Sequence, residues 1–123
     1  MILAFKQDFV PKIKEGSKIH TIREDKPNRW KKGNTIHFAT GVRTKNYNQF
    51  HEGKCTSVQQ IKITYPPTDT FSDIIIEIDG IILNMEAMQT LAYNDGFKHL
   101  LKFCLWFSKD FKGKIIHWTD FEY

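Results

Sequence analysis

The sequence predicts an α+β fold in which short strands close into a small mixed β-barrel with about three helices packed around it. The chain has 123 residues, which suits a single domain over 1–123. Runs typical of strands outnumber helical runs, and the short turns between them favour antiparallel pairing. Closing such strands into a barrel removes exposed sheet edges and leaves the helices on the outside.

The first third of the chain is predicted to hold two strands and a short helix. Residues 1–6 have the composition of a short buried strand. A helix is indicated over 9–15, because Pro11 lies near its start and Gly16 directly follows its end. After a glycine turn, residues 35–40 again favour a strand.

The middle of the chain is predicted to add two more strands. Residues 54–65 alternate weakly and favour a strand, which two prolines end because proline cannot donate a ladder hydrogen bond. A further strand over 74–78 leads into Asp79 and Gly80, a pair typical of a tight hairpin turn.

The last third is predicted to hold two helices and a closing strand. Between Asn84 and Asn94 apolar residues recur at three-residue steps, and Asn84 is typical of an N-cap. The next run, 97–107, has a wide apolar helical face, and Asp95 lies where the N-cap of that helix is expected. Residues 113–123 favour the final strand.

The composition restricts the class of protein. Hydrophobic residues make up 41% of the chain, which excludes a disordered protein. The net charge of +4 suits an anionic partner such as nucleic acid, although spare surface lysines explain it equally well. Cys55 and Cys104 match no zinc-binding spacing, so neither a metal nor another cofactor is expected. No apolar run approaches the roughly 20 residues that cross a bilayer, and no export signal is visible, which predicts a cytoplasmic protein with reduced thiols and no membrane partner.

The segment from Glu15 to Asp25 carries the main candidate functional residues. Lys18 can act as a base that activates the hydroxyl of Thr21, provided that burial lowers the pKa of the lysine. Arg23 offers a planar fork to a carboxylate, a phosphate or a base edge. The alternative is an ordinary strand whose cations lie in water.

The backbone distinguishes these two interpretations. In a regular strand, Lys18 and Thr21 would point to opposite faces, since side chains alternate with period two. They converge only if the chain bends or makes a helical turn between them, and Gly16 directly upstream favours a bend. The catalytic interpretation therefore predicts irregular backbone between Lys18 and Thr21.

Asp95 also has two interpretations, which are compatible with each other. It is a simple helix cap, or it is a carboxylate at the mouth of a site that acts as an acid or a base. A helix N-terminus would stabilise the anion in either case.

A third group mixes aromatic and cationic residues on loops and strand ends. Its members are Trp30, Lys31, Lys32, Arg43, Lys45, Tyr47 and Phe50. Such a mixture suits phosphate contact with base stacking, and it is also common on ordinary surfaces. Near the end of the chain, Trp118 and Phe121 are expected to pack into the core, and His117 and Asp120 to form a polar pair.

The run GSKIHTIR, from Gly16 to Arg23, resembles the GxKxxTxR form of the signature of ASCH domains. The pattern RWKKGNTIHFATGVRTK, with LAYNDGF and GKIIHWTDFEY further on, is similar to an ASCH-like group common in phages and prophages, so the resemblance covers nearly the whole chain. It implies a PUA-like fold, a small β-barrel with helices at one opening, and an association with RNA.

The resemblance also implies roles for individual residues. Bacterial ASCH amidohydrolases that act on N4-acetylcytidine have a similar KxxTxR run and are thought to use its Lys and Thr with a downstream Glu. Their counterparts here are Lys18, Thr21 and Asp95, where Asp95 departs from the pattern because aspartate is one methylene shorter than glutamate. Extra residues between Gly41 and Lys54 are a second departure. The residues expected to bind substrate are Arg23, His20, Trp30, Arg43 and Lys45.

Three functions are consistent with these observations. The first is an amidohydrolase that removes an acyl group from a modified nucleobase such as N4-acetylcytidine. The second is an RNA-binding module without catalytic activity, and the third is a ribonuclease that needs no metal. The expected partner is RNA or a modified nucleoside, while the oligomeric state is not readable from the sequence.

Overall fold

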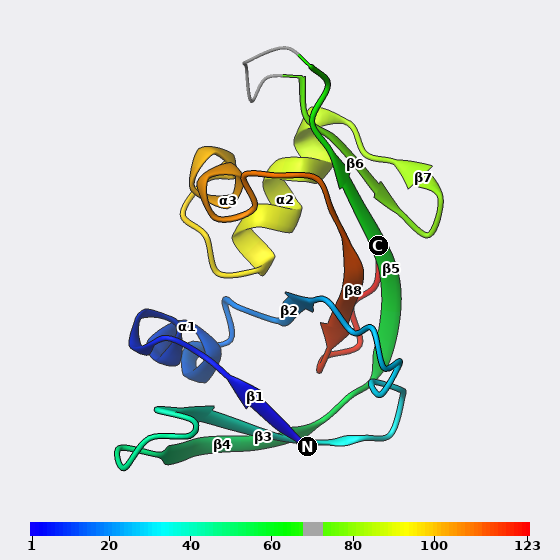
Figure 1. Ribbon diagram of the computed structural model, residues 1–123. Helices are drawn as coiled ribbons and strands as arrows, with labels where there is room; N and C mark the ends of the chain where they lie inside the picture. The colour runs from blue at the N-terminus through cyan, green and yellow to red at the C-terminus, as the bar shows by residue number, and fades with distance from the viewer. Residues whose placement is uncertain (68–72) are drawn as a thin grey trace.

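The computed structural model describes residues 1–67 and 73–123, and within them the chain forms an α+β fold with eight strands in two sheets and three α-helices (Figure 1). The smaller sheet has the order β1-β3-β4 and consists of β1 (Ile2–Ala4), β3 (Thr35–Thr40) and β4 (Asn48–Lys54). The larger sheet has the order β2-β8-β5-β6-β7 and consists of β2 (His20–Arg23), β8 (Phe111–His117), β5 (Ser57–Thr64), β6 (Ile75–Ile78) and β7 (Ile81–Ile82).

The helices lie on one side of the two sheets (Figure 1). They are α1 (Val10–Glu15), preceded by the 3-10 turn η1 (Gln7–Phe9), then α2 (Met85–Asn94) and α3 (Leu100–Trp106). Two predicted helix ends are confirmed. Gly16 ends α1 in the left-handed region at φ 90°, and the Asn84 side chain accepts a hydrogen bond from the Ala87 amide at the start of α2.

The predicted closed barrel is wrong, because the strands form two separate sheets. β1 is one edge strand of the smaller sheet, and β2 is one edge strand of the larger sheet. Among the described strands no ladder joins these two edge strands. A side chain crosses the gap instead, since Arg23 donates from Nη2 to the Ala4 carbonyl at 2.5 Å. We call this gap the β1–β2 seam.

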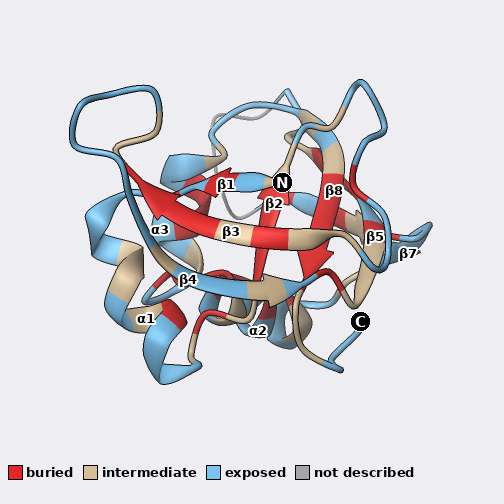
Figure 2. Ribbon diagram, turned by 90° about the horizontal axis from the view of Figure 1, so that it is seen from below, coloured by how far each residue is buried: buried red, intermediate tan, exposed pale blue. Residues whose placement is uncertain are grey.

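Two other details of the sheets differ from the sequence-based expectation. β1 pairs with β3 in parallel, whereas the remaining ladders in the described residues are antiparallel. β4 was not predicted, because its residues are mostly polar and exposed and show no apolar alternation (Figure 2).

The core consists of two apolar clusters that share strand β8. Ile115 belongs to the cluster beneath α2 and α3, whereas its neighbour Ile116 belongs to the cluster around Phe38 of β3. Successive side chains of a strand point to opposite faces, so β8 contributes to both clusters. In the antiparallel register, Thr21 lies opposite Ile116. The candidate nucleophile is therefore held on a strand that is paired with the centre of the core.

Candidate functional site

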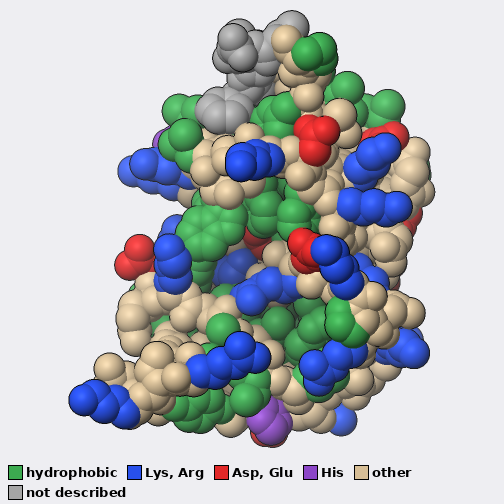
Figure 3. Space-filling model, in the orientation of Figure 1, with side chains coloured by type: hydrophobic (Ala, Val, Ile, Leu, Met, Phe, Trp, Pro, Cys, Tyr) green, Lys and Arg blue, Asp and Glu red, His purple; other side chains and the backbone are tan. Residues whose placement is uncertain are grey.

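A pocket opens at the β1–β2 seam, on the face where hydrophobic and cationic side chains lie next to one another (Figure 3). Its volume is about 490 Å³, within the range of roughly 300–1,000 Å³ that is usual for small-molecule sites. Four separate parts of the chain line it: Ala4, Phe5, Lys6 and Phe9; Lys18, Thr21, Ile22 and Arg23; Gly41 and Val42; and Asp95, Phe97, Trp106 and Phe107.

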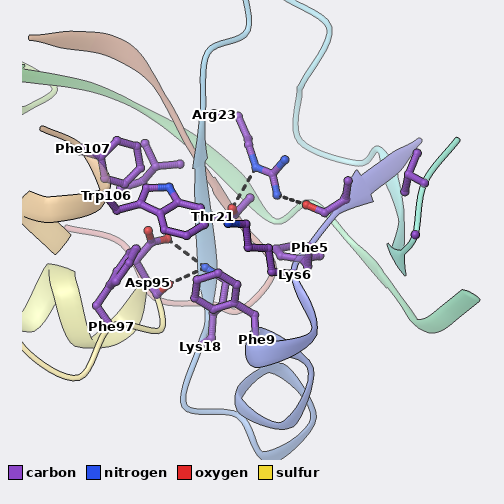
Figure 4. A pocket seen from close by; sticks show the side chains of 14 residues that line it. Phe5, Lys6, Phe9, Lys18, Thr21, Arg23, Asp95, Phe97, Trp106 and Phe107 are labelled. Atoms are coloured by element: carbon purple, nitrogen blue, oxygen red, sulfur yellow. Dashed lines mark hydrogen bonds and ion pairs between the residues drawn. The ribbon is translucent and has the colours of Figure 1, made fainter. Parts of the chain in front are cut away.

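The backbone before β2 is irregular, as the convergence of Lys18 and Thr21 requires. The chain leaves α1 at Gly16 and enters β2 only at His20, so Lys18 precedes the strand and Thr21 lies within it. The Ile19 amide donates to the Asn94 carbonyl at 2.9 Å, which ties this bend to the end of α2. Both Lys18 and Thr21 consequently line the same pocket (Figure 4).

Lys18 is a buried lysine with a carboxylate partner. The residue is 2% exposed, and Nζ donates to the backbone carbonyl of Asp95 at 2.6 Å and to Asp95 Oδ1 at 3.2 Å. Burial lowers the pKa of Lys18, and this effect outweighs the opposing attraction of Asp95. The Phe9 ring, 4.9 Å from Nζ, contributes to the burial. The condition that the catalytic interpretation sets for this lysine, a lowered pKa, is therefore met.

Thr21 and Arg23 form a second polar pair in the pocket. Arg23 donates from Nε to Thr21 Oγ1 at 3.1 Å, while the same guanidinium reaches across the seam to Ala4. Since the hydroxyl accepts this bond, its own proton remains available to a base. The cation of Arg23 also favours negative charge that develops on Oγ1.

Asp95 lies in the pocket, but the prediction that it caps the following helix is wrong. Its backbone, at φ −86° and ψ 4°, continues the last turn of α2, and its amide donates to the Leu91 carbonyl. α3 begins only at Leu100, because Gly96 at φ 92° turns the chain away first. Asp95 Oδ1 lies 3.2 Å from Lys18 Nζ and 3.1 Å from His20 Nδ1.

Aromatic side chains form the walls of the pocket, and no sequence motif marks them as functional. Phe5 and Phe9 lie on one side, with Phe97, Trp106 and Phe107 on the other (Figure 4). Trp106 is 49% exposed although it touches both Phe9 and Phe97, with ring centroids 5.7 Å apart in each case. Their only sequence signal is a place in apolar runs, which core packing explains equally well.

Four of the residues expected to bind substrate do not line the pocket. Trp30 is buried in the core cluster around Phe38, where its large apolar ring fills space. His20 is fully buried behind Asp95. Arg43 and Lys45 are exposed on the loop that follows Gly41, next to the pocket residues Gly41 and Val42 but outside the lining.

The predicted pair of His117 and Asp120 is also not formed. Asp120 is exposed, whereas His117 is buried and its Nε2 lies 2.9 Å from Gln59 Oε1. His117 Nδ1 is buried without a hydrogen-bond partner among the described residues. Trp118 packs against Phe38 as expected, whereas Phe121 is 37% exposed.

His117 makes folding dependent on pH. Burial lowers its pKa from 6.5 to about 4, while the same imidazole in the unfolded chain titrates near 6.5. Between these two pH values the unfolded state binds more protons than the folded state, so the protein becomes less stable as the pH is lowered. We expect the free energy of unfolding to decrease by about 2 kcal/mol between roughly pH 8 and pH 5. Urea titrations across this range measure the effect.

A matched variant separates His117 from other titrating groups. In His117→Gln, the amide can still donate to Gln59 but does not titrate. The pH slope should diminish without vanishing, because burial also lowers the pKa of His20. An unchanged slope in His117→Gln would contradict this assignment.

Comparisons with known proteins add no relative: no protein-family model, no curated protein and no solved structure matches the chain. No helix in residues 1–67 and 73–123 is long and apolar enough to cross a membrane. The same residues contain no cluster of three or more His, Cys, Asp or Glu side chains that could hold a metal ion. A functional interpretation therefore depends on the geometry of the pocket.

Proposed function

We propose that this protein is an ASCH-like, PUA-related amidohydrolase that removes the acyl group from a modified nucleobase such as N4-acetylcytidine. The observation that carries the proposal is the convergence of Lys18, Thr21 and Asp95 on one aromatic-walled pocket. These three side chains come from two distant parts of the chain, so their meeting is not a consequence of sequence proximity. Flat aromatic walls suit a nucleobase, because every base offers a π-face for stacking.

Thr21 begins the reaction as the nucleophile. Lys18 Nζ, as the neutral amine, takes the hydroxyl proton while Oγ1 bonds to the acyl carbon, and the electrons of the carbonyl double bond move onto its oxygen. Arg23, which already donates to Oγ1 at 3.1 Å, supplies positive charge next to this oxyanion.

Asp95 transfers a proton to the leaving amine. The proton held by Lys18 passes through Asp95, whose Oδ1 lies 3.2 Å from Nζ, to the nucleobase nitrogen as the carbon–nitrogen bond breaks. Water then attacks the acyl ester on Thr21, with Lys18 again as base, releasing the carboxylic acid and restoring the hydroxyl. The net reaction consumes one water and yields a free exocyclic amine. A variant of this scheme has Thr21 hold the attacking water instead of bonding to the acyl carbon.

Incubation of the purified protein with N4-acetylcytidine tests the proposal. We expect chromatography to show cytidine and acetate formed in equal amounts, and Thr21→Val to lower the rate by at least about 10³-fold, because the nucleophile is lost. Thr90→Val is the matched control, since Thr90 is exposed on α2 and lies outside the pocket.

The alternative functions are outcomes of the same experiment. Absence of turnover in the wild-type protein, or full activity in Thr21→Val, would overturn the proposed mechanism. Salt-dependent binding of single-stranded RNA without turnover would indicate a binding module. Cleavage of that RNA in the presence of a chelator would indicate a ribonuclease that needs no metal.

A further inference from the structure

Behind the pocket, a chain of buried and partly buried hydrogen bonds leads from Asp95 through His20 to Tyr123. We propose that His20 and Tyr123 are positioning residues that fix the orientation and hydrogen bonding of the Asp95 carboxylate. The inference about catalysis rests on the proposed amidohydrolase function, whereas the arrangement of the hydrogen bonds does not.

The geometry of this chain is continuous. His20 is 0% exposed, with Nδ1 3.1 Å from Asp95 Oδ1 and Nε2 2.5 Å from the Tyr123 hydroxyl. The same hydroxyl accepts a hydrogen bond from Asn94 Nδ2 at 3.2 Å. Neither His20 nor Tyr123 lines the pocket, so they reach a ligand only through Asp95.

The hydrogen-bonding capacity of each group gives the chain a direction. The Asn94 amide nitrogen is only a donor, so the Tyr123 hydroxyl accepts from it and has its own proton free for His20 Nε2. With Nε2 as acceptor, the neutral imidazole carries its proton on Nδ1 and donates it to Asp95 Oδ1. Asp95 Oδ1 then receives donors from both His20 and Lys18, which leaves Oδ2 for the pocket.

Tyr123 is itself held in place by strand β5. Its amide donates to Gln59 Oε1 at 2.9 Å, and its carbonyl accepts from Gln59 Nε2 at 3.0 Å. Gln59 Oε1 also accepts from His117 Nε2 at 2.9 Å. These bonds fix the backbone of Tyr123 against a side chain of the larger sheet and so hold its hydroxyl next to His20.

The buried surroundings of His20 favour its neutral form. Burial lowers the pKa of its imidazole, against the opposing effect of Asp95, and Lys18 also lowers it. His117, with its ring centroid 5.2 Å away, and Tyr123 complete the titratable groups that face it. A neutral His20 can donate a hydrogen bond to the Asp95 carboxylate without adding a second positive charge next to Lys18.

Kinetics of three variants test the positioning role. Tyr123→Phe removes the proton given to Nε2, and His20→Leu removes the whole link. We expect kcat to fall by about 10-fold in Tyr123→Phe and about 100-fold in His20→Leu, with KM nearly unchanged. His20→Asn, whose amide can replace the Nδ1 donor, should recover most of the loss. A rise in KM without a fall in kcat would instead make His20 a substrate-binding residue and overturn the proposal.

Nitrogen NMR of the imidazole gives a test that is independent of activity. In the wild-type protein, the 15N shifts of His20 should show the tautomer with its proton on Nδ1, and Tyr123→Phe should shift the population toward Nε2. A wild-type tautomer protonated on Nε2 overturns the proposal. The expected tautomer in a protein that hydrolyses no acylated nucleoside would support the arrangement and reject the proposed function.

Discussion

Replacing Lys18 with methionine should abolish hydrolysis of N4-acetylcytidine, whereas the same replacement of Lys114 should leave it intact. Methionine keeps most of the length and apolar contact of the lysine but cannot accept a proton. Lys18 is proposed to act as base in both halves of the reaction, so we expect kcat/KM to fall by at least about 10³-fold. Initial rates with saturating and limiting substrate measure the loss.

Lys114 is a close match for Lys18 outside the pocket. It is 8% exposed, and its Nζ forms an ion pair with Asp25 Oδ2 at 2.9 Å. Removing one partner of a buried ion pair costs about 3–5 kcal/mol, so both variants should lose stability to a similar degree. Activity should be assayed at a temperature at which circular dichroism shows that both variants are folded. A difference in activity then reflects catalysis and not stability. Equal activities of the two variants would contradict a catalytic Lys18.

Replacing Gly96 with alanine should damage both stability and activity. Gly96 has φ 92°, and a Cβ atom there would lie 2.9 Å from Lys18 Cδ and 2.9 Å from Phe9 Cδ1. Backbone strain and overpacking together lead us to expect a loss of about 3 kcal/mol in the free energy of unfolding. The hydrolysis rate should also fall, because the new methyl group displaces Lys18 from Asp95.

Gly80→Ala separates the two causes. Gly80 has a similar φ of 83°, but an added Cβ would meet nothing within 4 Å. It should therefore show only the strain, about 1–2 kcal/mol, with unchanged activity. Urea denaturation and hydrolysis rates measured on both variants provide the comparison. A Gly96→Ala protein that matches Gly80→Ala in both would show that the close approach to Lys18 has no consequence.

The sequence predicts the main elements well where periodicity or end signals are strong. The strand over 35–40 coincides with β3, and the turn at Asp79 and Gly80 has positive φ at both residues. Strand β4 and the open β1–β2 seam were not predictable in this way. Polar exposed strands carry no apolar alternation, and whether two sheet edges meet depends on contacts between distant segments.

The candidate site was predictable in part, for a physical reason that differs from residue to residue. Lys18, Thr21 and Arg23 lie close together in the chain, so a single bend suffices to bring them to one pocket. Asp95 lines the pocket too, although its predicted role as a cap of α3 is wrong. Trp30 has a large aromatic ring that suits either base stacking or core packing, and only the fold decides between these two roles.

The β1–β2 seam joins the site to the stability of the whole domain. Its two edges belong to different sheets, and the Arg23 side chain supplies a direct hydrogen bond across it. A ligand bound there contacts residues of both sheets at once and holds the two sheets together. Occupancy should then raise the melting temperature by mass action, whether or not any bond is broken. Screening nucleosides by thermal shift can thus find the preferred ligand before a chemical assay exists for it.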